Sequence, residues 1–211
     1  MKKKLSAVIA CLLLSACAEH FVDYQAYLDR RGVVAPATAG FQHCHGYGCQ
    51  FIADVTLDEA EWKDIEKSFK PKPKNAEKER QALARAIGVF ETKVGAITGT
   101  HVDHSGTFEK MGHYQLDCVD ESTNSTVYLA LLEQKGLMRF HSTQAPTVRL
   151  PFQTGRWPHQ TAVIVEKENG ALFAVDSWFH GNGFSAEIMP LNVWKDGWNP
   201  AQRHDSLEKV K

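Results

Sequence analysis

The spacing of apolar residues predicts two long helices and a hairpin of strands. Apolar residues recur at three- and four-residue steps over 76–96, the period of a helix with one buried face. Another helix is expected from Asp117, whose side chain can cap it, to Gly136, a residue suited to a left-handed stop. Between 161 and 178, two nearly all-apolar runs flank a turn signal at 168–170, which predicts a buried hairpin.

A strand and a shorter helix precede these elements. Phe51, Ala53 and Val55 alternate as in a strand, and the segment 56–59 has the spacing of a capping box that opens a helix. Pro71 then ends that helix. Together, the helices and the strands predict an α+β fold.

The N-terminus has the layout of a secretory signal. Three lysines precede an apolar run over 5–14 that is too short to span a bilayer. The small residues before Cys17 resemble the lipobox of bacterial lipoproteins, in which the cysteine is acylated and becomes the mature N-terminus. We therefore expect a signal peptide over 1–16 and a lipid-anchored tether over 17–40, and an ordinary signal peptide cut nearby is the alternative. Ala18 favours an outer-membrane lipoprotein facing the periplasm.

Composition and charge argue against a nucleic-acid partner. The chain has a formal net charge of −1, and the predicted signal removes three lysines and no acid, so the mature chain is more acidic still. The longest basic cluster, at 70–74, is interrupted by prolines and followed by acids. The remaining length fits one domain over 41–198, with a polar, frayed tail over 199–211. We expect a monomer.

Cysteine usage singles out one thiol. Cys11 lies in the signal, Cys17 in the lipobox, and Cys44 and Cys49 flank a short glycine-containing loop, which leaves Cys118 without an assigned role. An unpaired cysteine at a helix start, in a chain expected in an oxidising compartment, is a candidate nucleophile. A structural cysteine, or a disulfide to either loop cysteine, is the alternative.

The predicted helix start bears on the chemistry of Cys118. Unpaired backbone N–H groups and the helix dipole favour thiolate, whereas Asp117 and Asp120 oppose it, so a cationic partner is required. His159 stands at the head of the predicted hairpin and Asp176 near the end of its return strand. A histidine near the sulfur would supply the cation.

The hairpin carries a family resemblance. His159, followed by a strand, a turn and Val-Asp-Ser-Trp at 175–178, resembles the histidine hairpin of papain-like cysteine proteases. The aspartate, and Asp-Cys-Val-Asp at 117–120, look more like bacterial transglutaminase-like cysteine proteinases. The resemblance covers about 113–180. It implies a papain/transglutaminase-like fold, in which N-terminal helices pack on an antiparallel sheet and the nucleophile opens a helix.

The resemblance also implies roles for single residues. Cys118 would be the nucleophile, His159 the base and Asp176 the residue that orients the imidazole. Trp178 would shield the histidine–aspartate pair from water. The backbone N–H of Cys118 is one candidate oxyanion donor and Gln115 is a candidate for the second.

One geometric expectation conflicts with these roles. A tight two-residue turn at 169–170 would place Asp176 opposite Val163 and leave His159 four positions away, roughly 13 Å at strand rise. A bulge, a strong twist or another register is required to bring the two side chains together.

Two histidine-rich segments offer ligands without a recognised metal pattern. In the segment 43–49 we favour a Cys44–Cys49 disulfide, closed over two glycines, with a metal site as the alternative. The second segment contains His101, Asp103, His104 and His113; it could line the site or bind a metal, and we expect solvated loop histidines. No metal and no cofactor are predicted.

The leading hypothesis is an envelope lipoprotein that hydrolyses amide bonds in peptides or proteins through Cys118. Two alternatives stay open. One is a cell-wall endopeptidase, although Asp176 stands where that class usually has a histidine. The other is a non-catalytic binding lipoprotein on the same fold, with its tryptophans as partner or sugar contacts.

Overall fold

The computed structural model of the chain describes residues 23–107, 112–151 and 157–205. The predicted signal peptide and lipobox, with Cys17, lie outside these ranges. Within the described ranges, no helix combines the length and apolar character needed to cross a bilayer.

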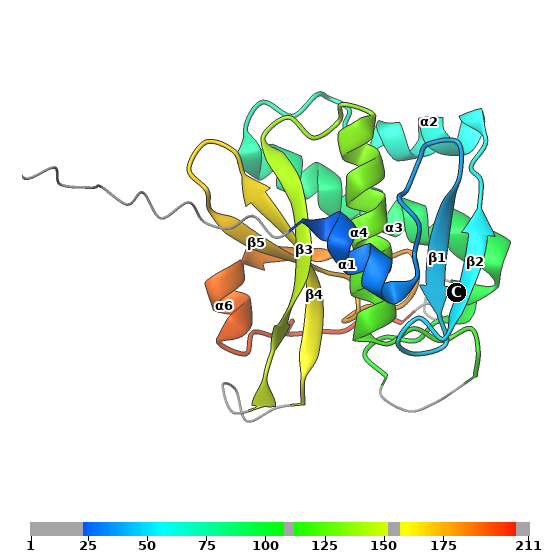
Figure 1. Ribbon diagram of the computed structural model, residues 1–211. Coiled ribbons are helices and arrows are strands. Elements are labelled where there is room, and N and C mark those ends of the chain that lie inside the picture. The colour runs from blue at the N-terminus through cyan, green and yellow to red at the C-terminus, as the bar shows by residue number, and fades with distance from the viewer. Residues whose placement is uncertain (1–22, 108–111, 152–156, 206–211) are drawn as a thin grey trace, which may run out of the picture.

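The fold is α+β, as predicted, with a central helix between two antiparallel sheets (Figure 1). Strands β3 to β6 form a four-stranded sheet in sequence order, and β1 and β2 form a separate hairpin. Helix α4 packs against β3, β4 and β5 on one side and against β1 on the other, and α3 packs beside α4. The element bounds are α1 (Tyr24–Arg31), β1 (Phe41–His45), β2 (Phe51–Val55), α2 (Glu59–Lys67), α3 (Ala76–Thr98), η1 (Thr100–Val102), α4 (Cys118–Gln134), β3 (His141–Arg149), β4 (His159–Glu166), β5 (Leu172–Asp176), β6 (Glu187–Pro190) and α6 (Leu191–Lys195).

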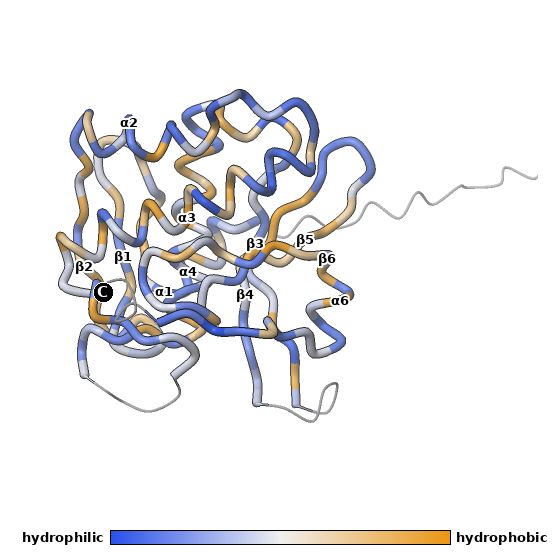
Figure 2. Tube along the Cα trace, turned by 180° about the vertical axis from the view of Figure 1, so that it is seen from behind, coloured by the Kyte–Doolittle hydropathy of each residue, from blue (hydrophilic) through white to orange (hydrophobic). Residues whose placement is uncertain are grey.

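Strand β4 is buried on both faces, which explains its nearly all-apolar sequence. Ala162 and Ile164 belong to the main core, whereas Val163 belongs to a smaller cluster with Leu191 and Trp194 of α6. Figure 2 shows the contrast between the apolar middle of the sheet and the hydrophilic turn between β4 and β5. His159 lies an even number of residues before Val163, so it faces the α6 side.

Helix α4 begins and ends as the sequence predicts. The Asp117 side chain accepts hydrogen bonds from the N–H groups of Val119 and Asp120, and Gly136 adopts a left-handed φ of 68° after the last turn. The helix is buried without interruption from Asp120 to Leu132, although the first half of that run is polar. This helix therefore needs hydrogen-bond partners on every side.

The predicted helix over 76–96 is confirmed as α3, and the start of α2 differs from expectation. The N-cap of α2 is Asp58, which forms the capping box with Glu61, so the box predicted over 56–59 lies two residues too early. Both boxes satisfy the same sequence spacing. The observed one leaves Leu57 outside the helix, where its side chain is buried in the core.

The two segments predicted to flank the domain, the tether and the tail, are both in contact with it where the structure describes them. In the segment expected to be a tether, Tyr27, Leu28 and Val33 are part of the main core. At the other end, in the segment expected to fray, the guanidinium of Arg203 lies 5.3 Å from the ring centre of Trp178. Asp205 bonds to His104 at 3.0 Å. The described parts of both segments, 23–40 and 199–205, are thus docked.

Gly88 provides a test of how closely α3 packs. A Cβ atom at this position would lie 2.5 Å from the carbonyl oxygen of Phe184 and 2.7 Å from its carbon, and both are backbone atoms that cannot rotate away. A glycine-to-alanine change normally stabilises a helix interior. Here we expect Gly88→Ala to lower the free energy of unfolding by about 1–3 kcal/mol, measured by urea denaturation.

The exposed position Gln81 on the same helix serves as the control. Gln81→Ala should change the free energy of unfolding by no more than about 0.5 kcal/mol. If Gly88→Ala proved as stable as the parent protein, the close contact between α3 and the loop at Phe184 would be wrong.

Candidate functional site

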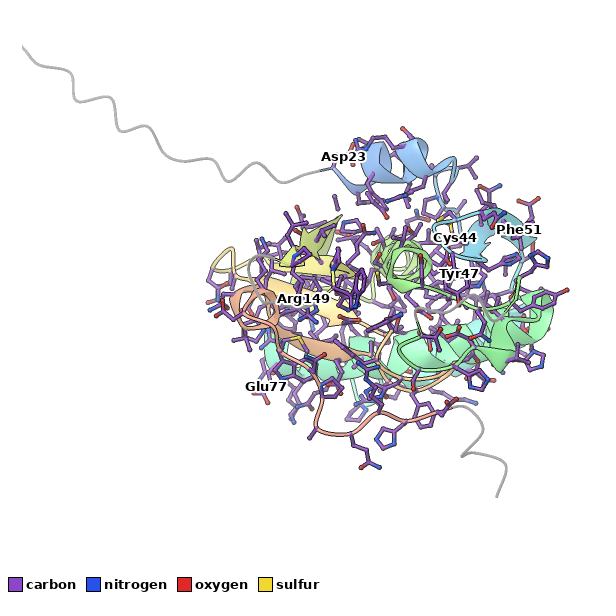
Figure 3. All side chains as sticks on the ribbon, turned by 90° about the horizontal axis from the view of Figure 1, so that it is seen from below. Asp23, Cys44, Tyr47, Phe51, Glu77 and Arg149 are labelled. Atoms are coloured by element: carbon purple, nitrogen blue, oxygen red, sulfur yellow. A yellow bond between two sulfur atoms is a disulfide. The ribbon has the colours of Figure 1, made fainter. Side chains whose placement is uncertain are left out.

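Cys118 is the first residue of α4, as predicted, and carries a free thiol in a partly buried position. The backbone N–H of Gln160, on β4, acts on the thiol by lowering its pKa, so it lies near the sulfur. Gln160 directly follows His159 in the chain, so the thiol lies beside the strand that carries the predicted base. Figure 3 views the molecule from the end where α4 starts, with Cys44 and Tyr47 on one side of this helix and Arg149, at the end of β3, on the other.

The Cys118 thiol is neutral at pH 7. Its pKa is raised to about 12, mainly by burial and also by the negative charges of Asp117 and Asp176. The N–H groups of Gln160 and of Cys118 itself act in the opposite direction. The expectation that a helix start favours thiolate therefore fails here, because desolvation outweighs the backbone N–H groups.

His159 and Asp176 are directly hydrogen-bonded. Nε2 of the imidazole lies 2.7 Å from Oδ2 of the carboxylate, and both residues are about 2% exposed. The turn before β5 is longer than expected, because the Glu166 N–H bonds to Ala171 O, and the strands pair Ala162 with Val175. Continuing that register places Asp176 opposite Thr161, two positions from His159 on the same face. The predicted gap of roughly 13 Å is thereby closed.

Aromatic side chains enclose this pair. The ring of Trp178 lies 4.6 Å from that of His159, in keeping with its predicted place beside the pair, and Phe179 lies at 5.2 Å. Trp194 contributes more than the sequence indicated. Its Nε1 donates to Oδ2 of Asp176 at 2.7 Å, so a single carboxylate oxygen receives both the imidazole and the indole.

The second imidazole nitrogen is the open position of the site. Since Nε2 faces a carboxylate, the hydrogen of the neutral ring is placed on Nε2 and the lone pair on Nδ1. Nδ1 of His159 is buried and has no hydrogen-bond partner among the described residues. A buried nitrogen with an unused lone pair can accept a proton from a group that approaches it.

Gln115 has other partners. Its Nε2 donates to Val102 O at 2.8 Å, and its Oε1 accepts from His104 N–H at 3.1 Å. Both ends of the amide thus hold the loop at η1. This arrangement gives no support to Gln115 as an oxyanion donor.

A hydrogen-bond network that the sequence did not reveal anchors Gln160. Its Nε2 donates to the Tyr27 hydroxyl at 2.6 Å and to the Ser122 hydroxyl at 2.7 Å. The Tyr27 hydroxyl also bonds to Thr123 at 2.9 Å. Helix α1 therefore helps to fix the strand segment whose backbone N–H lowers the pKa of the Cys118 thiol.

Several carboxyl groups are buried behind the site. Burial raises the pKa of Glu121 to about 7 and that of Asp120 to about 7, and it raises the pKa values of Glu91 and Asp103 well above their ordinary range. The Ser177 hydroxyl donates to Glu121 Oε2. Asp120 and Glu121 are themselves buried, although acids in the first turn of a helix are ordinarily explained by the helix dipole alone.

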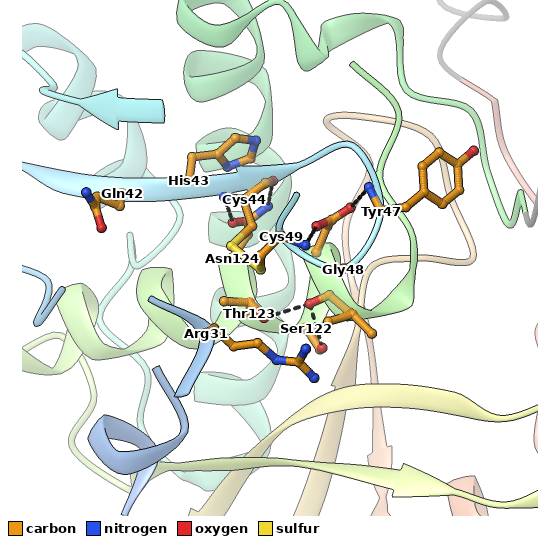
Figure 4. Close-up of a disulfide and its surroundings, with 12 residues drawn as sticks. Arg31, Gln42, His43, Cys44, Tyr47, Gly48, Cys49, Ser122, Thr123 and Asn124 are labelled. Carbon is orange, nitrogen blue, oxygen red and sulfur yellow. Dashed lines mark hydrogen bonds between the residues drawn. A yellow bond between two sulfur atoms is a disulfide. The ribbon is translucent and has the colours of Figure 1, made fainter. Parts of the chain in front are cut away.

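The Cys44–Cys49 disulfide is confirmed (Figure 4). Asn124 holds it to α4 through two hydrogen bonds, from the Cys44 N–H at 2.7 Å and to the Cys44 O at 2.8 Å. The N–H groups of Tyr47 and Cys49 donate to the two carboxylate oxygens of Asp120 at 2.7 and 2.6 Å. The loop thus supplies backbone partners for the buried first turns of α4.

The histidine-rich segments do not form a metal site within the described ranges. The one group of metal-ligand types that converges there is Cys44, Cys49 and Asp120, and its two sulfurs are bonded to each other. His43 is a core residue: its Nδ1 lies 3.0 Å from the Tyr128 hydroxyl, and burial lowers its pKa to about 3. The residues of the second segment do not converge either, and His104 is paired with Asp205.

Comparison with family models, with curated proteins and with solved structures finds no match.

The buried carboxyls predict a dependence of stability on pH. With a pKa near 7 in the folded chain and about 4.5 when unfolded, Glu121 binds more protons in the folded state between these values. The stabilisation that this proton provides is therefore complete below pH ~4.5 and is lost as the pH rises through 7. For Glu121 alone, the free energy of unfolding falls by about 3 kcal/mol over this range. Urea denaturation at pH 5 and pH 8 measures this difference.

Glu121→Gln separates this effect from other titrations. The amide can still accept from Ser177 but carries no charge, so the difference between pH 5 and pH 8 should shrink. Glu168→Gln, at an exposed position in the turn before β5, should leave the difference unchanged. Identical pH profiles for the parent protein and Glu121→Gln would contradict the burial of a titrating carboxyl.

The high pKa of Cys118 predicts slow alkylation. At pH 7 iodoacetamide should modify this thiol more slowly than a free cysteine, and the rate should keep rising above pH 9. Asp117→Asn keeps a side-chain cap but removes a charge that raises the thiol pKa, so it should accelerate the reaction several-fold. Mass spectrometry of the Cys118 peptide gives the rates. A plateau below pH 8 would instead reveal a thiolate.

Proposed function

We propose that the chain is a cysteine-dependent hydrolase that cleaves amide bonds in peptides or proteins through an acyl-enzyme thioester. Cys118 is the nucleophile, His159 the base and Asp176 the residue that fixes the imidazole. The observation that carries this proposal is the buried 2.7 Å bond between His159 and Asp176, which leaves Nδ1 open. The backbone N–H of Gln160, the residue after His159, lowers the pKa of the Cys118 thiol, which supports the nearness of the two segments.

The neutral thiol determines how the first step proceeds. The Cys118 sulfur attacks the carbonyl carbon of the substrate while its proton moves to Nδ1 of His159. The tetrahedral intermediate collapses when the imidazolium returns that proton to the leaving amine, which leaves a thioester on Cys118. Water, deprotonated by Nδ1, then attacks the thioester and releases the acid and the free thiol.

Asp176 favours this sequence in two ways. Its carboxylate fixes Nε2 as the protonated nitrogen and stabilises the imidazolium that forms during attack. The indole of Trp194 holds the same carboxylate oxygen in place. Trp178 and Phe179 limit the access of water to the pair, which strengthens its electrostatic interaction.

The start of α4 offers one oxyanion donor. The Asp117 side chain accepts from Val119 and Asp120 and not from the N–H of Cys118, so that group is left for a ligand. The positive end of the helix dipole lies at the same point. We assign the backbone N–H of Cys118 to the oxyanion and leave the second donor unassigned.

The fold type and location extend the same proposal. A papain/transglutaminase-like domain is supported by a thiol at a helix start that packs on an antiparallel sheet bearing histidine and aspartate. Location in the periplasm, on an outer-membrane anchor at Cys17, is supported by the Cys44–Cys49 disulfide, since such bonds persist in oxidising compartments. We propose that the protein acts there as a monomer on envelope peptides or proteins.

A non-catalytic binding protein is the second candidate. The specific observation in its favour is the high pKa of the Cys118 thiol, which leaves almost no thiolate at neutral pH. Cys118, His159 and Asp176 would then have a structural role. An experiment on the reactivity of the thiol distinguishes the hydrolase from the binding protein.

Acyl transfer from an activated ester provides that experiment. We expect p-nitrophenyl acetate to acetylate the Cys118 peptide in the parent protein, observed by mass spectrometry, and no acetylation of this peptide in Cys118→Ala. His159→Ala should slow acetylation about 100-fold or more, the usual contribution of a general base. Asp176→Asn should slow it as well, because the imidazole loses its orientation.

His180→Ala is the matched control, because His180 is a second buried histidine bonded to a carboxylate, Glu187 at 3.0 Å. In this variant, Cys118 should be acetylated at the parental rate. If His159→Ala and His180→Ala behaved alike while both stayed folded, His159 would not be the base and the binding protein would be favoured.

A further inference from the structure

The loop between α2 and α3 presents unpaired positive charge. It runs Lys-Pro-Lys-Pro-Lys over 70–74, and the side chains of Lys70, Lys72 and Lys74 are exposed. None of the three has an ion-pair partner among the described residues, whereas Lys67, just before them, is paired with Asp64 at 2.7 Å. The prolines fix the backbone φ angle at alternate positions, so the loop holds its lysines in a restricted arrangement.

A hollow of about 310 Å³ lies where this loop meets the start of α3. Four cationic side chains line it, and no acidic residue does. Arg85 is held by a bond from its guanidinium to Ser68 O at 2.9 Å, and Lys78 by a bond to Gln81 at 3.0 Å. The lining residues are Pro71, Lys72, Pro73, Lys74, Lys78, Gln81, Ala82 and Arg85.

A second hollow of about 320 Å³ adjoins the first and shares Lys72 and Pro73 with it. Lys70 and Arg139 add positive charge to its wall. Its one acidic residue, Glu66, is paired with Lys135 at 2.8 Å. Positive charge is therefore concentrated here in a chain whose overall formal charge is −1, so the local field favours anions.

We infer that the first of these cavities, the Lys–Pro hollow, binds a phosphate-bearing ligand. Several converging cations suit an anion with more than one charge, and a fixed guanidinium among flexible ammonium groups matches the oxygens of a phosphate. A volume of about 310 Å³ accepts a phosphate group together with part of the molecule that carries it.

The Lys–Pro hollow is separate from the candidate active site. The adjoining hollow includes Gly136 and Leu137, which follow the last turn of α4, whereas Cys118 opens its first turn. Helix α4 separates these points; its seventeen residues span about 25 Å. In Figure 1 the loop after α2 accordingly lies at the end of the molecule opposite the start of α4. This inference does not depend on the proposed hydrolase activity.

Binding of two probes by the full-length protein tests the inference and identifies the source of the phosphate. Calorimetric titration with pyrophosphate reports on soluble ligands, and co-sedimentation with phosphatidylglycerol vesicles reports on lipid headgroups, with phosphatidylcholine vesicles as the uncharged comparison. The double variant Lys72→Glu/Lys74→Glu should weaken binding by at least about 25-fold, since each lysine near an anionic surface contributes about fivefold. Binding should also weaken with added salt.

Lys195→Glu is the matched control, because Lys195 lines a different hollow, next to Asn169 and Leu172. It changes the net charge in the same direction and should bind like the parent protein. Circular dichroism melting checks that all variants are folded.

Pyrophosphate binding that the double variant alone loses would assign a soluble phosphate ligand. Selective loss of binding to phosphatidylglycerol vesicles would assign a lipid headgroup. Absence of binding to both probes, or equal binding by the double variant and Lys195→Glu, would overturn the inference.

Discussion

The structure depends on the burial of helix α4, whose first half is polar. A buried polar side chain is tolerated when it is hydrogen-bonded, so each polar position on α4 requires a partner from a neighbouring segment. Asp120 is bonded by the backbone of the disulfide loop, Glu121 by Ser177, Ser122 by Gln160 and Asn124 by Cys44. These hydrogen bonds hold the β1–β2 hairpin, the four-stranded sheet and α1 against α4.

The same burial explains the chemistry at the helix start. A thiol at the N-terminus of an exposed helix would lose its proton more readily, but at Cys118 desolvation and two nearby acids raise the pKa. An enzyme with such a thiol has to move the proton during attack, so the position of the base matters more than a resting ion pair. The carboxylate of Asp176, which is hydrogen-bonded to both His159 and Trp194, fixes the position of the His159 ring.

Local signals in the sequence predicted the features that depend on local physics. The cap at Asp117, the left-handed stop at Gly136 and the Cys44–Cys49 bond each involve a few neighbouring residues, and all three are present. The spacing of His159 and Asp176 could not be derived, because it depends on the number of residues in one turn. Trp194 carries no local signal at all, since it lies on α6 and its partner, Asp176, lies on β5.

Buried acids were missed for a related reason. Asp120 and Glu121 look like ordinary residues of a helix first turn, and only the surrounding segments reveal that water is excluded from them. Likewise, α1 looked like part of a tether because its apolar residues are few. Its role becomes visible when Tyr27 is seen bonded to Thr123 and Gln160.

The long sequence separation between α4 and its hydrogen-bond partners has a consequence for folding. They come from positions separated by 96, 80 and 73 residues from the side chains they satisfy. Contacts of such long range form late and together, because each requires the closure of a long loop. The helix that carries Cys118 therefore acquires its buried environment only when the first helix and the disulfide hairpin are in place. Shortening the chain from the N-terminal side would remove Tyr27 from this set before it reached any residue of the site itself.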